Sequence, residues 1–447
     1  MSEAVRRIAE EPVRLYVDNS HPRRSDHDSA AGRRPEHPLA TADEAFRRLP
    51  PYWRESAEII FADTGSPYRV TTDAVYFGMP LGPEATPLVI RGGYSDVAGV
   101  LTARDSAGEF VDTLTRLDVR DDELVGAVLK RLSSAGTTAD SPVGTAVSIR
   151  GNGPNPHGTS RIYLQRTVGR VSEGDTFLVQ RPSVWLEPAE TLNLTSHDGR
   201  SLNLTLIGIG LKPAAGKGLN FHNVRAQCDT CELVFNGAGG FVHSYSRLQG
   251  GIAEATLAPD PSDLPGPTRR SLRAQAGVFV QSNAASNFLW AARGGVLGGH
   301  LTFKKINVRV SQGGVFIPQS LEALEAPIHI MGGGTAVVEP QLEGRAIVGG
   351  WGRESNRARI RNVRGADGDG LRVSNGGSVA AGGPIFLDVS GCERDGVRLD
   401  DGALASFGLP GGLAGLVTAG APNGAFGMNV RNASRALVGR DAVVTGG

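Results

Sequence analysis

Carboxylates at matching positions of two similar segments are the residues best placed to do chemistry. Asp369 and Asp395 each stand directly before a glycine, in GDGLRVSNGG and RDGVRLDDGA; Asp400 and Asp401 follow, and Asp367 precedes the first. If the segments stack as successive coils of a parallel sheet, the first two carboxylates lie about 5 Å apart. That separation suits the carboxylate pair of a retaining glycosidase. Aspartate before glycine also suits a tight turn, because it accepts backbone hydrogen bonds, and both interpretations stay open.

Aromatic side chains that could stack on sugar rings are few and lie mostly in the first half of the chain. Trp290 and Trp351 are the tryptophans of the later part. Trp351 stands in GGWGRESNRAR, amid glycines and arginines, which favours an exposed position. We therefore take Trp351 as the preferred contact for a glycan.

The cysteines and histidines do not form a metal-binding motif. Cys228 and Cys231 form an isolated C-x-x-C, whereas a structural zinc site needs four ligands, and Cys392 lies far away. We interpret the first two as ordinary positions that flank a turn. The histidines of the later part of the chain are His222, His243, His300 and His329. No two of them have the H-x-x-x-H spacing of a metal site. The segment GLKPAAGKG lacks the serine or threonine that follows the lysine of a phosphate loop, so we do not interpret it as one. Taken together, these patterns predict no metal and no cofactor.

The bulk composition indicates a folded chain that is rich in turns. Glycine supplies 61 of 447 residues while 40% of residues are hydrophobic, which argues against disorder and fits solenoids and β-sandwiches. The 46 basic and 46 acidic residues balance and form no basic stripe, so a nucleic-acid partner is not expected. No stretch approaches the length of a membrane span, and the N-terminus lacks the apolar core of a signal peptide. We expect synthesis in the cytoplasm without a Sec signal, and no membrane insertion.

The N-terminal part predicts a short helix set among short strands. Val13, Leu15 and Val17 alternate as in a half-buried strand. In HPLATADEAFRRLPPYW, Thr41 and Glu44 form a capping box, and two prolines end the helix. The apolar face of this helix consists of Ala42, Ala45, Phe46 and Leu49.

This order of strand, polar loop, P-x-A-T-x-x-E-A helix and short strands resembles the entry of pectate-lyase-like right-handed parallel β-helix proteins. The resemblance covers the N-terminal part and implies that the helix plugs the open end of a solenoid. The motif set of the polygalacturonase-like hydrolases is not present in order: Asp400 and Asp401 give a D-D pair, but no G-H-G follows. The local signatures of pectate lyases are also missing. These departures put the enzymatic activities of the superfamily in doubt.

Residues 114–186 change character and predict a small antiparallel β module. The segments TAVSIRGN, SRIYLQRTV and EGDTFLVQRP alternate apolar and polar residues between polar turns. We interpret this module as an insertion before the main solenoid. It resembles modules that interrupt β-helices of phage and prophage origin.

From residue 187 onward the chain predicts repeated β-coils. Three late copies align in GDGLRVSNGGSVA, RDGVRLDDGALAS and AFGMNVRNASRAL, with spacings of 26 (396−370) and 31 (427−396) between their glycines. Weaker copies begin at Gly218, Gly277 and Gly314. A period of about 27 residues without helical patterning indicates one coil of short parallel strands per repeat.

Alternation within the late copies predicts which side chains face the core. The inward ladders are Leu371 and Val373, Val397 and Leu399, and Met428 and Val430. The outward stripe is Arg372, Arg398 and Asn429. The last coil must be covered, either by a partner subunit or by the final residues of the chain.

The predicted fold class is all-β: a right-handed parallel β-helix solenoid with an N-terminal capping helix and a small β insertion. The predicted domains are residues 1–113, the cap and first coils; residues 114–186, the antiparallel module; and residues 187–447, the main parallel β-helix.

The favoured function is a structural, receptor-contacting fibre, spike or baseplate protein of a phage tail or tail-like particle. The expected partners are two further copies of the chain in a homotrimer, other tail or baseplate proteins, and surface polysaccharide; the expected location is the virion. The alternative is a polysaccharide lyase or glycoside hydrolase that acts through Asp369 and Asp395. A surface adhesin exported by a non-Sec route is a third interpretation.

Overall fold

The structure of the protein is a computed structural model. It describes residues 8–81, 87–106, 108, 110–133, 146–165, 168, 171–196, 202–243, 246–250, 252–257, 270–274, 277–283, 287–338, 357–364, 368–381, 386–407, 416–417 and 423–438. Strands account for nearly all the regular structure, and α1 (Ala42–Arg48) is the one helix in these ranges. Within them, no helix has the length and apolar character needed to cross a membrane.

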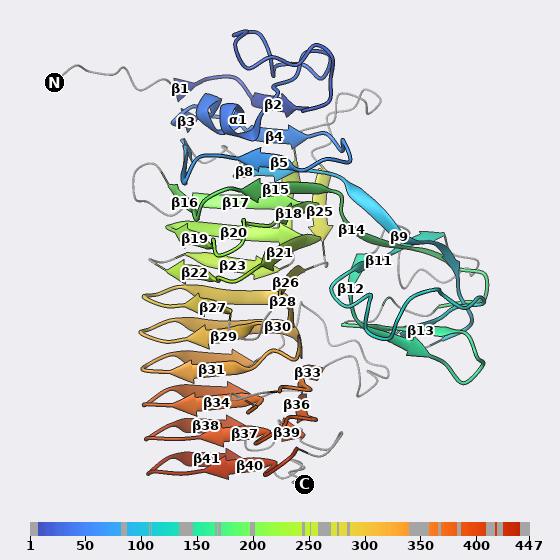
Figure 1. Cartoon of the computed structure of the whole chain (residues 1–447), viewed down its shortest axis with the longest axis vertical. Helices are drawn as coiled ribbons and strands as arrows, with labels where there is room; N and C mark the ends of the chain where they lie inside the picture. The colour runs from blue at the N-terminus through green and yellow to red at the C-terminus, as the bar shows by residue number, and fades with distance from the viewer. Residues whose placement is uncertain are drawn as a thin grey trace, which may run out of the picture.

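Two large parallel sheets build an all-β solenoid, whose coils stack along the long axis of the molecule (Figure 1). The ten-stranded sheet consists of β6 (Ala74–Phe77), β16 (Leu192–Ser196), β19 (Leu219–His222), β22 (Gly240–His243), β27 (Phe288–Ala291), β29 (Asn307–Val310), β31 (Ile328–Met331), β34 (Leu371–Ser374), β37 (Val397–Leu399) and β40 (Met428–Val430). The twenty-stranded sheet consists of β2 (Val13–Val17), β4 (Ala57–Phe61), β5 (Tyr68–Val70), β8 (Leu88–Arg91), β15 (Val184–Pro188), β17 (Leu202–Ile207), β18 (Ile209–Leu211), β20 (Val224–Asp229), β21 (Cys231–Phe235), β23 (Arg247–Gly250), β26 (Val278–Ser282), β28 (Val296–Lys304), β30 (Val315–Leu324), β32 (Thr335–Val338), β33 (Arg357–Arg361), β35 (Ser378–Ala381), β36 (Phe386–Ser390), β38 (Leu404–Phe407), β39 (Leu416–Val417) and β41 (Arg435–Val438).

Two small sheets accompany them. The first consists of β1 (Ile8–Ala9), β3 (Tyr52–Trp53) and β7 (Met79–Pro80), and the second is the hairpin of β24 (Ile252–Leu257) and β25 (Arg270–Ala274). One continuous apolar core runs inside the solenoid from the N-terminal coils to the coil of β38. Because side chains alternate along each strand, every second residue joins this core and the residues between them face outward.

The late coils pair in the predicted register, and Arg372, Arg398 and Asn429 fall into one outward column. The apolar side chains expected to face inward are buried in β34 and β37. The last strand departs from the prediction, because Met428 is only partly buried and Val430 is 43% exposed. Among the described strands, β40 has a neighbour on one side only, so its apolar residues are covered from one side.

Two predictions about the earlier coils are wrong. Gly277 and Gly314 precede β26 and β30 of the twenty-stranded sheet, whereas Gly370 and Gly396 precede strands of the ten-stranded sheet. The weaker copies at these two glycines are therefore not equivalent to the late ones. Coil length is also uneven: the pairings of β27 with β29 and of β29 with β31 enclose 19 (308−289) and 20 (328−308) residues. The ladder constrains only the paired strands, so the turns between them can differ in length.

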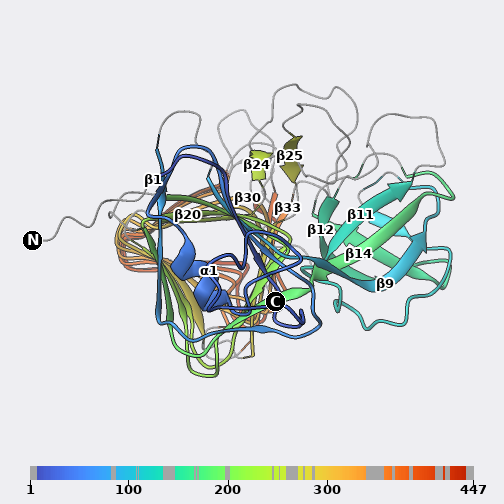
Figure 2. The same cartoon turned by 90° about the horizontal axis from the view of Figure 1, so that it is seen from above.

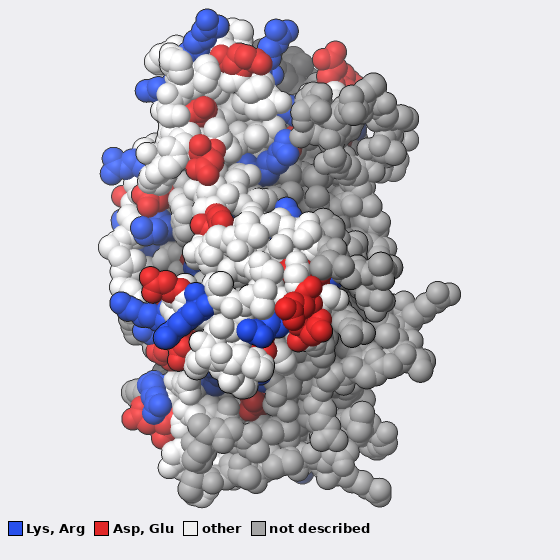
Figure 3. All heavy atoms as spheres, turned by 90° about the vertical axis from the view of Figure 1, so that its right-hand side faces the viewer, with Lys and Arg blue, Asp and Glu red and all other residues white. Residues whose placement is uncertain are grey.

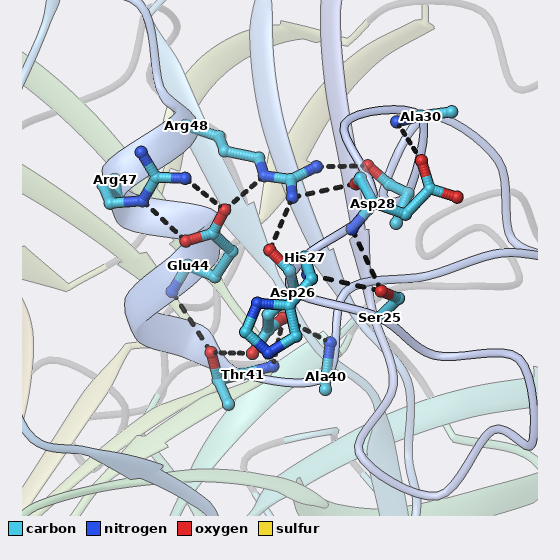
Figure 4. A network of polar contacts seen from close by, with 11 residues as sticks. Ser25, Asp26, His27, Asp28, Ala30, Ala40, Thr41, Glu44, Arg47 and Arg48 are labelled. Atoms are coloured by element: carbon cyan, nitrogen blue, oxygen red, sulfur yellow. Dashed lines mark hydrogen bonds and ion pairs between the residues drawn. The ribbon is translucent and has the colours of Figure 1, made fainter.

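Helix α1 begins after Thr41, as predicted, and the Thr41 hydroxyl accepts a hydrogen bond from the Glu44 N–H at 3.3 Å. The second half of the capping box does not form, because the Thr41 N–H donates to Asp26. The Glu44 carboxylate instead accepts hydrogen bonds of 2.5–2.6 Å from Arg47 and Arg48 (Figure 4). Arg48 also donates to three carbonyl oxygens of the preceding loop, at 2.8–3.0 Å. These contacts fasten the N-terminal loop to α1.

The apolar face of α1 joins the solenoid core. Ala42, Ala45 and Phe46 are buried, and the Phe46 ring meets Phe77 edge-on with 6.3 Å between centroids. Seen from above, α1 lies within the outline of the coils (Figure 2).

Replacing Glu44 by Gln should lower the free energy of unfolding by about 1 kcal/mol at neutral pH and change it little near pH 2. Hydrogen bonds from Arg47 and Arg48 lower the pKa of Glu44 from 4.5 to about 2. The stability that the ionised carboxylate contributes is therefore present above about pH 4.5 and is lost as the pH falls towards 2. Urea unfolding across this range tests the expectation, with the exposed Glu36→Gln as control. An equal loss at every pH would contradict it.

A separate antiparallel module lies beside the solenoid (Figure 1). Its six-stranded sheet consists of β9 (Tyr94–Thr102), β10 (Phe110–Asp112), β11 (Val128–Ser133), β12 (Ala146–Pro154), β13 (Ser160–Leu164) and β14 (Thr176–Pro182). The module has its own apolar core, in which Arg131 and Asp175 form a buried ion pair. Its first two strands precede residue 114; the division into domains at 113 and 186 stays a prediction.

The module packs on the outward face of the twenty-stranded sheet. Val125 joins Phe279 and Leu324 in a small buried apolar cluster. Beside it, the Gln165 side chain donates to Thr302 Oγ1 at 2.6 Å. On this side of the molecule, basic and acidic side chains are interspersed over the surface (Figure 3).

An ion-pair chain fastens the module to the solenoid. Arg361 of β33 donates from Nε to Glu322 of β30 at 2.5 Å, and from its terminal nitrogens to Asp122 of the module at 3.2 Å. Arg361 also donates to the carbonyl oxygen of Arg150 in β12 at 3.1 Å. Glu322 is 1% exposed, so removal of this guanidinium would break a buried ion pair.

Arg361→Met should destabilise the protein by about 3 kcal/mol, because it removes the guanidinium that pairs with the buried Glu322 carboxylate. The double variant with Glu322→Gln should recover part of this loss, since no charge then stays buried. Urea unfolding measures both changes, and Arg225→Met, at an exposed outward position of β20, is the control. Unchanged stability of the single variant would show that the ion-pair chain does not hold the module.

Candidate functional site

The outward side chains of the ten-stranded sheet form a continuous column along the solenoid. We define the outward column by residues that pair in succession from strand to strand: Asn193, Asn220, Phe241, Trp290, Arg309, His329, Arg372, Arg398 and Asn429. Neighbouring strands lie about 4.8 Å apart, so the nine positions extend over about 38 Å. In Figure 1 their strands follow one below another along the solenoid.

Three aromatic rings gather at the middle of this column. Phe241 and Trp290 have 5.5 Å between ring centroids, and Phe288 meets them at 5.2 and 6.3 Å in edge-to-face geometry. All three side chains are half-buried although they lie on the outer face of the sheet. The indole N–H of Trp290 donates to the hydroxyl of Ser311 at 2.8 Å, which fixes the orientation of the ring. We call Phe241, Phe288 and Trp290 the aromatic triad.

Arg309 follows Trp290 in the column. Its guanidinium lies over the Phe288 ring, 5.1 Å from the centroid. Its Nε is buried and has no hydrogen-bond partner, and no ion pair involves Arg309 in the part of the chain that the structure describes. The next position is His329, which is 5% exposed.

Side-chain amides occupy the N-terminal end of the column. Asn220 donates to Asn193 Oδ1 at 2.8 Å, and Asn193 donates to the carbonyl oxygen of Asp73 at 2.9 Å. Such a ladder orients the amides and holds both side chains on the outer face. Amide groups both donate and accept hydrogen bonds, which matches the hydroxyl groups of sugars.

At the C-terminal end, arginines of the column pair with aspartates of the neighbouring turns. Arg398 donates from Nε to Asp400 at 2.6 Å and lies 3.5 Å from an oxygen of Asp369. Arg372, one coil earlier, lies 3.5 Å from Asp400. The like charges of the two stacked arginines are thus separated by carboxylates from the neighbouring turns.

The structure brings Asp369 and Asp395 together in successive turns, as the sequence predicts. The backbone N–H of Asp395 donates to Asp369 Oδ1 at 3.2 Å, and Asn429 donates to Asp395 Oδ2 at 2.7 Å. The two residues are 1% and 3% exposed. Burial and backbone hydrogen bonding are what the turn interpretation requires. The catalytic role of this pair stays a prediction.

The sequence analysis also named Trp351 and Asp401. Trp351 lies outside the described residues. Asp401, next to Asp400, is exposed and occupies the left-handed region with φ of 55°, as expected of a turn residue.

The cysteines are buried and free of disulfides. Cys228 and Cys231 flank Thr230, whose φ of 51° marks a turn, so the interpretation as turn-flanking positions is confirmed. Burial raises the pKa of Cys392 to about 11, which makes its thiol unreactive. Across the described ranges, no three His, Cys, Asp or Glu side chains gather so as to hold a metal ion.

Comparisons with known proteins return phage tailspikes among solved structures. The tailspike gp49 of Pseudomonas phage LKA1 is 11% identical, aligned over 83% of this chain and 75% of its own, with a TM-score of 0.18. The Gp54 tailspike of Acinetobacter baumannii bacteriophage AP22, in complex with A. baumannii capsular saccharide, is 10% identical over 85% and 71%, with a TM-score of 0.20. The tailspike gp61 of Pseudomonas phage phi297 is 9% identical over 86% and 76%, with a TM-score of 0.23. TM-scores this low establish neither a shared fold nor a shared function.

No family model matches the sequence, and no curated protein matches it.

The sequence pattern drew attention to Trp290 but not to Phe241, Phe288 or Arg309 beside it. Phe241 and Trp290 stand in different coils, and the hairpin of β24 and β25 lies between them in the chain. The signal that could have found them is alternation, since in FLWA the buried Leu289 lies between two outward rings.

Asp369→Ala should lower the free energy of unfolding by about 1–3 kcal/mol, because the buried backbone N–H of Asp395 loses its acceptor and Arg398 loses a carboxylate. Asp401→Asn should change it little, since asparagine tolerates the same left-handed backbone. Urea unfolding of the two variants measures the difference. Full stability of Asp369→Ala would remove the structural explanation for this carboxylate.

Proposed function

We propose that this chain is a glycan-contacting component of a phage tail or tail-like particle: a fibre, spike or baseplate protein. The observation that carries the proposal is the aromatic triad at the centre of the outward column. Large aromatic rings on the outer face of a solenoid have no role in its core, and half-buried rings that remain accessible are the usual platforms for sugar stacking. The triad therefore supports a carbohydrate partner.

The rest of the outward column supports a chain-like ligand. Amides lie on one side of the triad and guanidinium groups on the other. Both groups hydrogen-bond to hydroxyl and ring oxygens, and their repeat of about 4.8 Å offers a contact at every coil. An extended polysaccharide along the solenoid axis would use these contacts in series.

The remaining parts suit a durable shaft. We propose that the coils close into a right-handed parallel β-helix, that α1 covers the N-terminal end of its core, and that the antiparallel module is a docked domain. We further propose that three copies assemble into a homotrimer attached to other tail or baseplate proteins of the virion. The exposed apolar side chains of the last coil, Val430, Leu437 and Val438, support a cover at that end. The mass of the purified protein, from light scattering on a sizing column, tests the trimer.

Trp290→Ala should weaken binding to a surface polysaccharide by about tenfold or more, because it removes the central stacking ring. The control is Tyr76→Ala, an aromatic residue 63% exposed on β6, at the N-terminal end of the same sheet. Binding of both variants to immobilised bacterial surface polysaccharides measures the contrast. Equal weakening, or no effect of Trp290→Ala on a polysaccharide that the native protein binds, would refute the triad as the contact.

A polysaccharide lyase or glycoside hydrolase is the second candidate, because Asp369 and Asp395 lie in successive turns beside the outward column. Incubation of a bound polysaccharide with the protein, followed by measurement of new reducing ends, tests it. Cleavage that Asp395→Asn abolishes at unchanged binding would favour the enzyme; an intact polysaccharide would favour contact alone.

A further inference from the structure

We propose that the glycan recognised by the outward column is acidic and that Arg309 binds its anionic group. This inference rests on the proposed function and specifies the chemical class of its ligand. The group is a carboxylate or a phosphate on a sugar that stacks against the aromatic triad.

Arg309 differs from the other arginines of the column in its partners. Arg372 and Arg398 lie 2.6–3.5 Å from the carboxylates of Asp369 and Asp400. Arg309 contacts the ring of Phe288, and among the described residues no carboxylate pairs with it. The column therefore holds one cation whose charge is not balanced locally.

The surroundings of Arg309 strengthen its attraction for an anion. The Phe288 ring of the triad covers one side of the guanidinium. His329, a buried side chain, follows Arg309 in the column, so the group is partly shielded from water. A charged hydrogen bond is stronger where water is partly excluded. The Nε has no hydrogen-bond partner in the described structure but is buried, so the terminal nitrogens are the donors that an outside anion would reach. Through its two terminal nitrogens, a guanidinium can bind a carboxylate or phosphate in bidentate fashion.

The position of Arg309 next to Trp290 favours a sugar that carries an anionic group. Arg309 pairs with Trp290 in the neighbouring strand, so the two side chains are about 4.8 Å apart along the axis. A sugar stacked on the indole would bring a substituent of its ring over the guanidinium. A neutral sugar at the same place would leave the cation without a partner, which disfavours it relative to an acidic one.

The experiment measures binding of the full chain to purified bacterial surface polysaccharides of three kinds: uronic-acid-containing, phosphate-containing and neutral. Each uronic-acid member is paired with its carboxyl-reduced form and each phosphate member with its dephosphorylated form. We expect binding to an acidic member, at least tenfold weaker binding to its neutralised form, and weakening by added salt. The neutralised form that loses binding identifies the anion as carboxylate or phosphate.

Variants assign the effect to Arg309. Arg309→Gln should weaken binding to the acidic polysaccharide at least tenfold, and Arg309→Lys should restore part of it, because lysine keeps the charge but not the bidentate geometry. Arg293→Gln, at an exposed turn position after β27, should bind like the native protein. Thermal unfolding confirms that each variant is folded.

The outcomes separate the inference from the function on which it rests. Binding confined to neutral polysaccharides, or unaffected by Arg309→Gln while Trp290→Ala abolishes it, overturns the acidic ligand and leaves the glycan-contacting function standing. Binding to no polysaccharide of the panel, or binding that neither variant changes, overturns the proposed function itself.

Discussion

The parallel pairing of each coil with the next is the constraint on which the rest of the structure depends. Backbone hydrogen bonds between coils hold equivalent residues about 4.8 Å apart, so each outward side chain lies beside its counterpart. The apolar half of every strand then closes into one continuous core. The polar half becomes a set of straight columns on the surface. A column of aromatic, amide and guanidinium groups is thus a direct consequence of strand pairing.

Stacking also places like charges side by side, and the molecule compensates for them from outside the column. Arg372 pairs with Arg398 in adjacent strands, and Asp400 of the following turn forms an ion pair with both. On the twenty-stranded sheet, Glu322 receives its cation from the next coil and shares it with Asp122 of the module. Ion pairing that neutralises a column of charges therefore also docks the antiparallel module on the solenoid. Arg309 stands apart because no such carboxylate accompanies it among the described residues.

The sequence could predict the parts in which a local pattern repeats without interruption. The start of α1 follows from Thr41 and the apolar residues after it, and the register of β34, β37 and β40 follows from glycine and strict alternation. Alternation could have marked Phe288 and Trp290 as outward. It could not bring them together with Phe241, because the hairpin of β24 and β25 lies between Phe241 and Trp290 in the chain. The sequence could not predict the burial of Asp369 either, because a catalytic carboxylate and a turn carboxylate would have the same residue type at the same position. The local sequence pattern thus predicts the register of the strands. The exposure of a side chain depends on neighbours from other coils, which the local pattern does not contain.

The most direct test of the central claim is a crystal structure of the protein with an oligosaccharide from a polysaccharide that it binds. We expect a sugar ring stacked on Trp290, the chain of sugars running along the ten-stranded sheet, and an anionic group beside Arg309. An oligosaccharide seated on the antiparallel module or on the twenty-stranded sheet, with the aromatic triad unoccupied, would contradict it.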